Sequence, residues 1–130
     1  MKRPWFAIAW FAGWGAFQAY AVSSILLGTW QRPAAFPEEA YRALIYADMV
    51  FIPLYFAAAT LLFLGHGAGR TIALFAGGAV VYVMVYLLAL SGFRGAGNLA
   101  FDSLFLALDL AAVVQVARRP TPGQPKNWVP

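Results

Sequence analysis

Three of the five acidic residues lie inside long apolar stretches, and these three are the residues best suited to chemistry. They are Asp48, Asp102 and Asp109. Ionisable side chains are costly and rare in the hydrocarbon layer, where they mark ligand, proton or ion sites. Two carboxylates held close together in a low dielectric cannot both ionise easily, which makes one a proton donor at neutral pH. Such a donor can protonate an alkene or an epoxide, or carry a transported proton.

The last apolar stretch carries a polar stripe. Asp109 follows Asp102 two helical turns later on the same face, Phe105 lies between them, and Asn98 lies one turn earlier. We expect this stripe to face the interior of a helical bundle. Asp109 then lies beneath Asp102 and tunes it from below.

A second stripe in the second apolar stretch has the same heptad spacing, with Tyr41, Asp48 and Tyr55. If the two stripes face each other, a carboxylate-lined cavity opens outward. Three other polar side chains are expected to point inward: Gln18, Tyr82 and Tyr86. Arg94, in an external turn, is expected to fold over the mouth as a counter-ion.

The alternative is a purely structural role for Asp48 and Asp102. Each lies four or five residues into its stretch, roughly 6–8 Å below the outer boundary at about 1.5 Å per residue. At that depth they could be hydrated, pair with Arg94 or Arg42, and only fix helix register. Asp109 lies deeper, so this alternative explains it less well.

Other chemistry has little support in the sequence. The absence of cysteine excludes disulfides and cysteine-ligated metals. We interpret the lone His66 as a solvated loop residue rather than a haem or metal ligand. The Trp10/Trp14 pair is interpreted as lipid-facing packing rather than a pigment or quinone site. We therefore expect no metal and no cofactor, and no nucleic-acid partner, because the basic residues lie at helix ends and in connections.

The elements that must position these side chains are membrane spans. The chain has 130 residues, of which 62% are hydrophobic and 11% charged, too apolar for a soluble domain. A spanning helix needs about 20 apolar residues, and four stretches qualify: Trp5–Leu27, Ala43–Leu64, Thr71–Ser91 and Asn98–Ala117. The sequence predicts an all-α integral membrane protein, an antiparallel bundle of four transmembrane helices over residues 1–119, with an extended tail over residues 120–130.

Small residues and one proline shape the predicted helices. Small residues spaced four apart let helices approach closely, and three pairs have this spacing: Ala9/Gly13, Ala12/Ala16 and Ala73/Gly77. Pro53 cannot donate a backbone hydrogen bond, so a kink is expected in the second helix.

The distribution of basic residues predicts the orientation. With a cytoplasmic N-terminus, the inside carries Lys2, Arg3, Arg70, Arg118, Arg119 and Lys126, and the outside carries Arg32, Arg42 and Arg94. This excess satisfies the positive-inside rule. We predict a protein of the bacterial inner membrane with both termini in the cytoplasm.

The segment Asp48-Met49-Val50-Phe51-Ile52-Pro53-Leu54-Tyr55-Phe56 resembles the acidic-x-Val-Phe…Pro-aromatic segment of the EXPERA family, the four- or five-helix membrane proteins that include sterol isomerases and the sigma-2 receptor. The resemblance covers this segment and the helix count. It implies a lipophilic ligand in a bundle cavity, with Asp48 in the place of a family acidic residue.

Three functions remain open from the sequence. The first is a cavity that binds a lipophilic, isoprenoid- or sterol-like molecule, with Asp48 and Asp102 catalysing isomerisation, cyclisation or epoxide opening without metal. The second is a small proton- or ion-coupled transporter that uses Asp109 and works as a homodimer. The third is an accessory subunit of a larger membrane complex.

Overall fold

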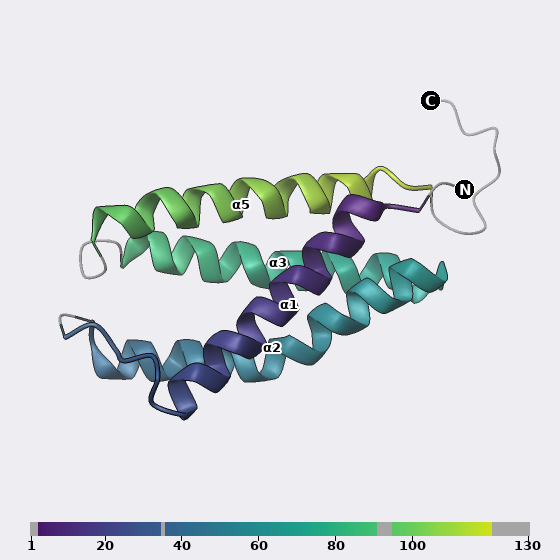
Figure 1. The fold of residues 1–130 in the computed structure, drawn as a ribbon. Helices are drawn as coiled ribbons and strands as arrows, with labels where there is room; N and C mark the ends of the chain where they lie inside the picture. Colours follow the sequence, from purple (N-terminus) through teal and green to yellow (C-terminus); the bar gives the residue numbers. More distant parts are fainter. Residues whose placement is uncertain (1–2, 35, 91–94, 121–130) are drawn as a thin grey trace.

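Four helices make up the regular structure of the computed structural model, which describes residues 3–34, 36–90 and 95–120 (Figure 1). The helices are α1 (Trp5–Leu26), α2 (Glu38–Leu64), α3 (Ala68–Ala89) and α5 (Ala96–Ala117). The prediction of an all-helical protein with four helices is confirmed. The predicted tail falls mostly outside the described residues, as does Arg94.

The start of α2 lies at Glu38, earlier than the apolar stretch that begins at Ala43. Pro37 precedes the helix, and Glu38 and Glu39 occupy its first turn. Negative side chains stabilise the positive end of a helix dipole, so the helix extends beyond its apolar part. The helix also continues through Pro53, and α2 bends along its length (Figure 1).

The junction between α2 and α3 is a short turn. Gly65 ends α2 with φ 70°, in the left-handed region that favours glycine. The side chain of His66 then accepts a hydrogen bond from the backbone N–H of Ala68 over 3.2 Å. This bond satisfies one backbone donor at the start of α3, so His66 has a local structural role.

The helices pack in a ring: α1 on α2, α2 on α3, α3 on α5, and α5 less extensively on α1. Two hydrogen bonds tie the end of α5 to the starts of other helices. The N–H of Ala7 donates to Gln115 Oε1 over 2.9 Å, and Arg70 Nη2 donates to the carbonyl of Ala117 over 3.1 Å. The starts of α1 and α3 and the end of α5 therefore lie at the same end of the molecule. We call this the basic end.

Among the described helices, α2, α3 and α5 are each long and apolar enough to cross a membrane. The first helix, α1, has 22 residues, as does α3. It is not among those three, because its tryptophans and Gln18 lower its hydropathy. The sequence predicts four spans, and length and composition support three of them.

Large apolar side chains are exposed on every helix, while much of the buried core is small. Phe17, Val50, Phe75 and Phe101, one from each helix, are 43%, 71%, 64% and 62% exposed. The fully buried residues include several alanines. A large exposed apolar surface indicates contact with lipid or with another protein, which agrees with an integral membrane protein.

Close helix contacts occur at glycines. A Cβ at Gly77 would lie 2.3 Å from Val113 Cγ2, and a Cβ at Gly15 would lie 3.2 Å from Tyr55 Cβ. Gly77 and its predicted partner Ala73 are both buried. The predicted contact at Gly13 is not found, because a Cβ there would meet no atom of a neighbouring helix within 4 Å. In α1 the contact is made by Gly15, on a different face.

Candidate functional site

A cavity of about 340 Å³ lies between the helices, towards the end opposite the basic end. Four of the predicted site residues that line it are polar: Gln18 of α1, Asp48 of α2, and Asn98 and Asp102 of α5. The structure therefore brings Asp48 of one predicted stripe and Asn98, Asp102 and Phe105 of the other to one cavity, while Tyr41, Tyr55 and Asp109 do not line it. Its volume falls within the range of small-molecule sites, roughly 300–1,000 Å³.

The two carboxylates differ in their surroundings. Asp102 is buried, at 4% exposure, and has an interaction partner. Asp48 is half-buried, but its Oδ1 is buried and has no hydrogen-bond partner among the described residues. An unsatisfied buried polar atom costs about 1–3 kcal/mol. Asp48 Oδ1 is therefore available to a polar group that enters the cavity.

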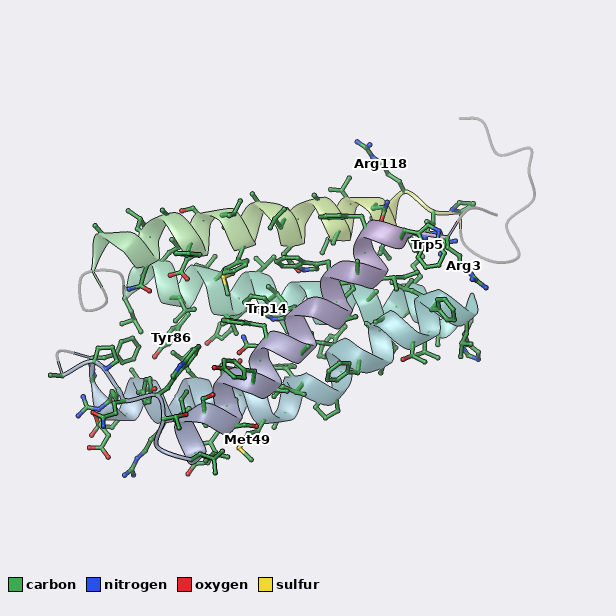
Figure 2. The ribbon with its side chains drawn as sticks, viewed as in Figure 1. Arg3, Trp5, Trp14, Met49, Tyr86 and Arg118 are labelled. Atoms are coloured by element: carbon green, nitrogen blue, oxygen red, sulfur yellow. The ribbon has the colours of Figure 1, made fainter. Side chains whose placement is uncertain are left out.

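The rest of the cavity wall is largely aromatic and aliphatic. Trp14, Phe17 and Phe105 line it, and these rings contact one another. Trp14 and Phe105 meet edge to face, with ring centroids 5.4 Å apart. Figure 2 shows the Trp14 side chain among the helices. A cavity with such walls and a few polar groups is suited to a lipophilic molecule that carries one polar function.

Beneath this aromatic layer lies Asp109, which is fully buried. Trp10 Nε1 donates a hydrogen bond to Asp109 Oδ1 over 2.8 Å, and Trp10 stacks on Trp14 with centroids 5.6 Å apart. The interpretation of Trp10 and Trp14 as lipid-facing is wrong, since Trp14 is only 4% exposed and Trp10 binds a buried carboxyl. The two tryptophans thus bring their indole N–H groups into the polar interior of the bundle as hydrogen-bond donors.

Tyr55 is fully buried and lies outside the cavity lining. Its hydroxyl lies beside the Trp14 indole and within electrostatic reach of both Asp48 and Asp109. The Tyr55 hydroxyl, Trp14 Nε1 and Asp109 Oδ2 are buried without a well-formed hydrogen bond among the described residues. Each of these three buried atoms therefore has hydrogen-bonding capacity to spare.

Two predicted cavity residues lie elsewhere. Tyr82 and Tyr86 line a different hollow, of about 260 Å³, with residues of α2 and α3. Tyr82 is 70% exposed, and Figure 2 labels Tyr86. Tyrosine occurs both at membrane interfaces and in protein interiors. The sequence alone therefore did not show which of these positions Tyr82 and Tyr86 occupy. Arg94 lies outside the described residues.

Several cavity residues had no signal in the sequence. Trp30, in the connection between α1 and α2, lines the cavity and also the adjoining hollow beneath that connection. Its ring meets Tyr20 edge to face at 5.6 Å. Met84 and Leu87 of α3 complete the apolar wall. Trp30 places this connection at the edge of the cavity.

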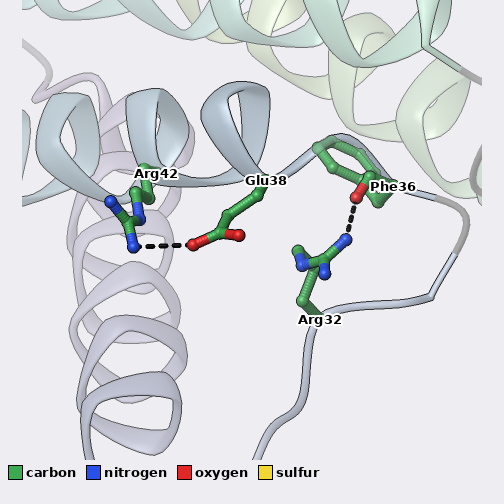
Figure 3. Close-up of polar contacts among 4 residues, drawn as sticks. All are labelled: Arg32, Phe36, Glu38 and Arg42. Carbon is green, nitrogen blue, oxygen red and sulfur yellow. Dashed lines mark hydrogen bonds and ion pairs between the residues drawn. The ribbon is translucent and has the colours of Figure 1, made fainter.

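The alternative pairing of Asp48 with Arg42 is not found. Arg42 Nη2 instead lies 2.6 Å from Glu38 Oε1, one helical turn earlier (Figure 3). Arg32, in the preceding connection, donates a hydrogen bond to the carbonyl oxygen of Phe36 (Figure 3). Both arginine side chains therefore have partners near the start of α2, and neither of these contacts involves Asp48.

Within the part of the chain that the structure describes, no three His, Cys, Asp or Glu side chains are grouped as metal ligands. The polar side chains that line the cavity include two carboxyl groups and two carboxamides, Asp48, Asp102, Gln18 and Asn98. Such a set can bind donors and transfer protons.

Comparison with protein-family models, with curated proteins and with solved structures found no match to this chain. The resemblance of the Asp48–Phe56 segment to the EXPERA family therefore stays a prediction.

Proposed function

We propose that the chain is a four-span antiparallel membrane bundle that binds a lipophilic small molecule and acts on it by proton transfer. The oblique contact of α1 with α2 and the hydrogen bond from Ala7 to Gln115 support placing α1 in the membrane with the other helices. The excess of basic residues at the end where α1 starts supports cytoplasmic termini.

One observation carries the proposal. Asp48 and Asp102, from two different helices, line a single cavity whose other walls are mainly apolar, and Asp48 Oδ1 is buried there without a partner among the described residues. A hydroxyl or amine on an apolar ligand would supply the missing donor. Because a buried polar atom without a partner costs about 1–3 kcal/mol, supplying that donor favours binding by a similar amount.

The same pair suits acid catalysis. A bare charge is unfavourable at a buried atom without a hydrogen bond, so Asp48 is the proposed acid and Asp102 the proposed base. In the isomerisation of a double bond, Asp48 gives its proton to one alkene carbon and positive charge develops on the other. Asp102 then removes a proton from the allylic carbon attached to that second carbon, and the electrons of the broken C–H bond form the new double bond. The proton count is unchanged, and the acid is restored when the proton passes from Asp102 to Asp48. Cyclisation and epoxide opening begin with the same protonation.

Tyr55 and Asp109 are proposed to hold and return a proton for Asp48. The Tyr55 hydroxyl lies within electrostatic range of both Asp48 and Asp109, and hydroxyl groups both donate and accept hydrogen bonds. Tyr55 is therefore the proposed group that passes a proton between Asp109 and Asp48. This relay would give the fully buried Asp109 carboxyl a role in the proposed reaction.

Binding tests the proposal with an isoprenoid alcohol, farnesol, against farnesene, which lacks the hydroxyl. Quenching of tryptophan fluorescence reports occupancy, because Trp14 and Trp30 line the cavity. The alcohol should bind about tenfold more tightly, because satisfying this buried oxygen is expected to contribute about 1.4 kcal/mol. Asp48→Leu should remove most of this preference and leave farnesene binding largely intact.

Glu39→Gln is the matched control, because Glu39 is an exposed acid on the same helix. It should leave the preference unchanged. Equal binding of alcohol and hydrocarbon to the wild-type protein, or an unchanged ratio in both Asp48→Leu and Asp102→Leu, would overturn the binding role. Mass spectrometry of small molecules that co-purify in mild detergent then supplies the substrate, on which Asp48→Asn should abolish turnover.

A further inference from the structure

Four basic side chains from separate parts of the chain meet at a second hollow, of about 230 Å³, at the basic end. Arg3 precedes α1, His66 lies in the α2–α3 turn, Arg70 lies in the first turn of α3, and Arg119 follows α5. Figure 2 shows Arg3 and Arg118 at this same end of the molecule. The helix ends, rather than one flexible segment, thus gather the positive charge.

Two of these side chains are held in place by contacts within the protein. Arg70 Nη2 donates to the carbonyl of Ala117 over 3.1 Å. The guanidinium carbon of Arg3 lies 4.6 Å from the ring centroid of Phe63 and 5.8 Å from that of Trp5. Cation–π contacts of this kind orient an arginine and leave its edge able to donate hydrogen bonds.

The sequence places no acidic side chain at this end. All five Asp and Glu residues lie at positions 38, 39, 48, 102 and 109. The last of these is buried against Trp10 in the interior. His66 also offers a hydrogen-bond donor to a ligand. Its Nδ1 accepts from the Ala68 N–H, so in the neutral ring the hydrogen is on Nε2.

Exposed apolar side chains border the hollow. Leu64 lines it and is 66% exposed, while Trp5 and Phe63, which hold Arg3, are 58% and 43% exposed. A free phosphate ion would make no apolar contacts with this border. A phospholipid, in contrast, would place its acyl chains against it. We propose that this hollow binds the phosphate of an anionic phospholipid head group, with the acyl chains along Trp5, Phe63 and Leu64.

This site resembles in its chemistry the basic pockets at helix ends that bind anionic lipids from the cytoplasmic side. It rests on membrane insertion, as the proposed function does, but not on the acidic cavity. The two sites share no lining residue. Failure of one therefore leaves the other standing.

The test uses the full chain in mixed micelles containing equal amounts of phosphatidylglycerol and phosphatidylcholine. Native mass spectrometry measures the ratio of the two lipids that stay bound. The wild-type protein should retain phosphatidylglycerol in preference. Arg3→Gln and Arg119→Gln should each lower the ratio about fivefold, the effect expected of one arginine at a lipid surface. Arg119→Lys should keep most of the preference, because it keeps the charge.

Arg118→Gln is the matched control. This substitution removes the same charge from the adjacent position, but Arg118 does not line the hollow, and in Figure 2 its side chain points away from the helices. Its ratio should match the wild type, and equal loss in Arg118→Gln and Arg119→Gln would reduce the effect to general electrostatics. Displacement of the lipid by a modest excess of inorganic phosphate would also overturn the lipid assignment. Circular dichroism of each variant in the same micelles confirms that it is folded.

Discussion

The hydrogen bond from Trp10 to Asp109 gives the sharpest prediction about what holds the interior together. The donor and acceptor are 2.8 Å apart, Asp109 is fully buried, and its other oxygen has no partner among the described residues. Trp10→Phe keeps an aromatic ring but removes the indole donor from Asp109. Hydrogen bonds to charged groups contribute about 1.5–3 kcal/mol, whereas those between membrane helices average about 0.6 and reach about 1.7. We expect about 1.5 kcal/mol, near the upper value for membrane helices, because the acceptor carboxyl is fully buried.

A double-mutant cycle separates this bond from the packing lost with the larger ring. Unfolding by SDS in mixed micelles, followed by circular dichroism, gives the free energy of unfolding for wild type, Trp10→Phe, Asp109→Leu and the double variant. Asp109→Leu alone removes a costly buried carboxyl but also leaves the Trp10 indole N–H without its acceptor, so its effect on stability combines a gain and a loss that only the cycle separates. The coupling energy should be about 1.5 kcal/mol. A coupling below about 0.5 kcal/mol would refute the reasoning, and Trp5→Phe, at an exposed site on the same helix, should change stability little.

Three further outcomes are expected. Gly69→Ala should destabilise the protein by about 1–3 kcal/mol, because its Cβ would lie 2.8 Å from the α2 backbone, while Gly78→Ala, with open space around it, should be neutral or stabilising in the same unfolding assay. Tyr55→Phe removes a buried hydroxyl without a well-formed bond, so stability should hold or rise while turnover of the identified substrate falls; unchanged turnover would remove Tyr55 from the relay. Because the chain has no cysteine, single cysteines at Gln31 and His66 should react with an impermeant maleimide from opposite sides of the membrane, Gln31→Cys from outside, and the reverse result would invert the proposed orientation.

The helices and the meeting of the carboxylates could be anticipated from the sequence. A run of about 20 apolar residues has few alternatives to a helix in lipid, since backbone groups must be satisfied within the segment. A carboxylate in such a helix is strongly disfavoured on the lipid side, so its position also indicates which face is internal. This reasoning places Asp48 and Asp102 towards one another, and both line the same cavity.

Aromatic residues could not be placed in the same way. The rings of Trp14 and Tyr82 suit a protein interior, a lipid surface or a membrane interface, yet the first is 4% and the second 70% exposed. One signal was available for Trp10, because a buried Asp109 requires a donor and the indole N–H groups of the first helix are candidates. The close contact at Gly15 could not be singled out by spacing, since Gly15 and Ala19 are four apart just as Ala9 and Gly13 are, yet Gly13 lies on the exposed face.

The arrangement of buried residues bears on the proposed choice between ligand chemistry and transport. The Tyr55 hydroxyl lies within electrostatic range of Asp109 and also of Asp48 at the cavity. Towards the basic end, the described interior continues with Ala73, Ala112 and Val116, each fully buried. Apolar side chains of this kind neither donate nor accept protons, so none of these three residues extends a proton path from Asp109 towards the basic end. This arrangement supports the proposed ligand chemistry over the alternative of proton transport.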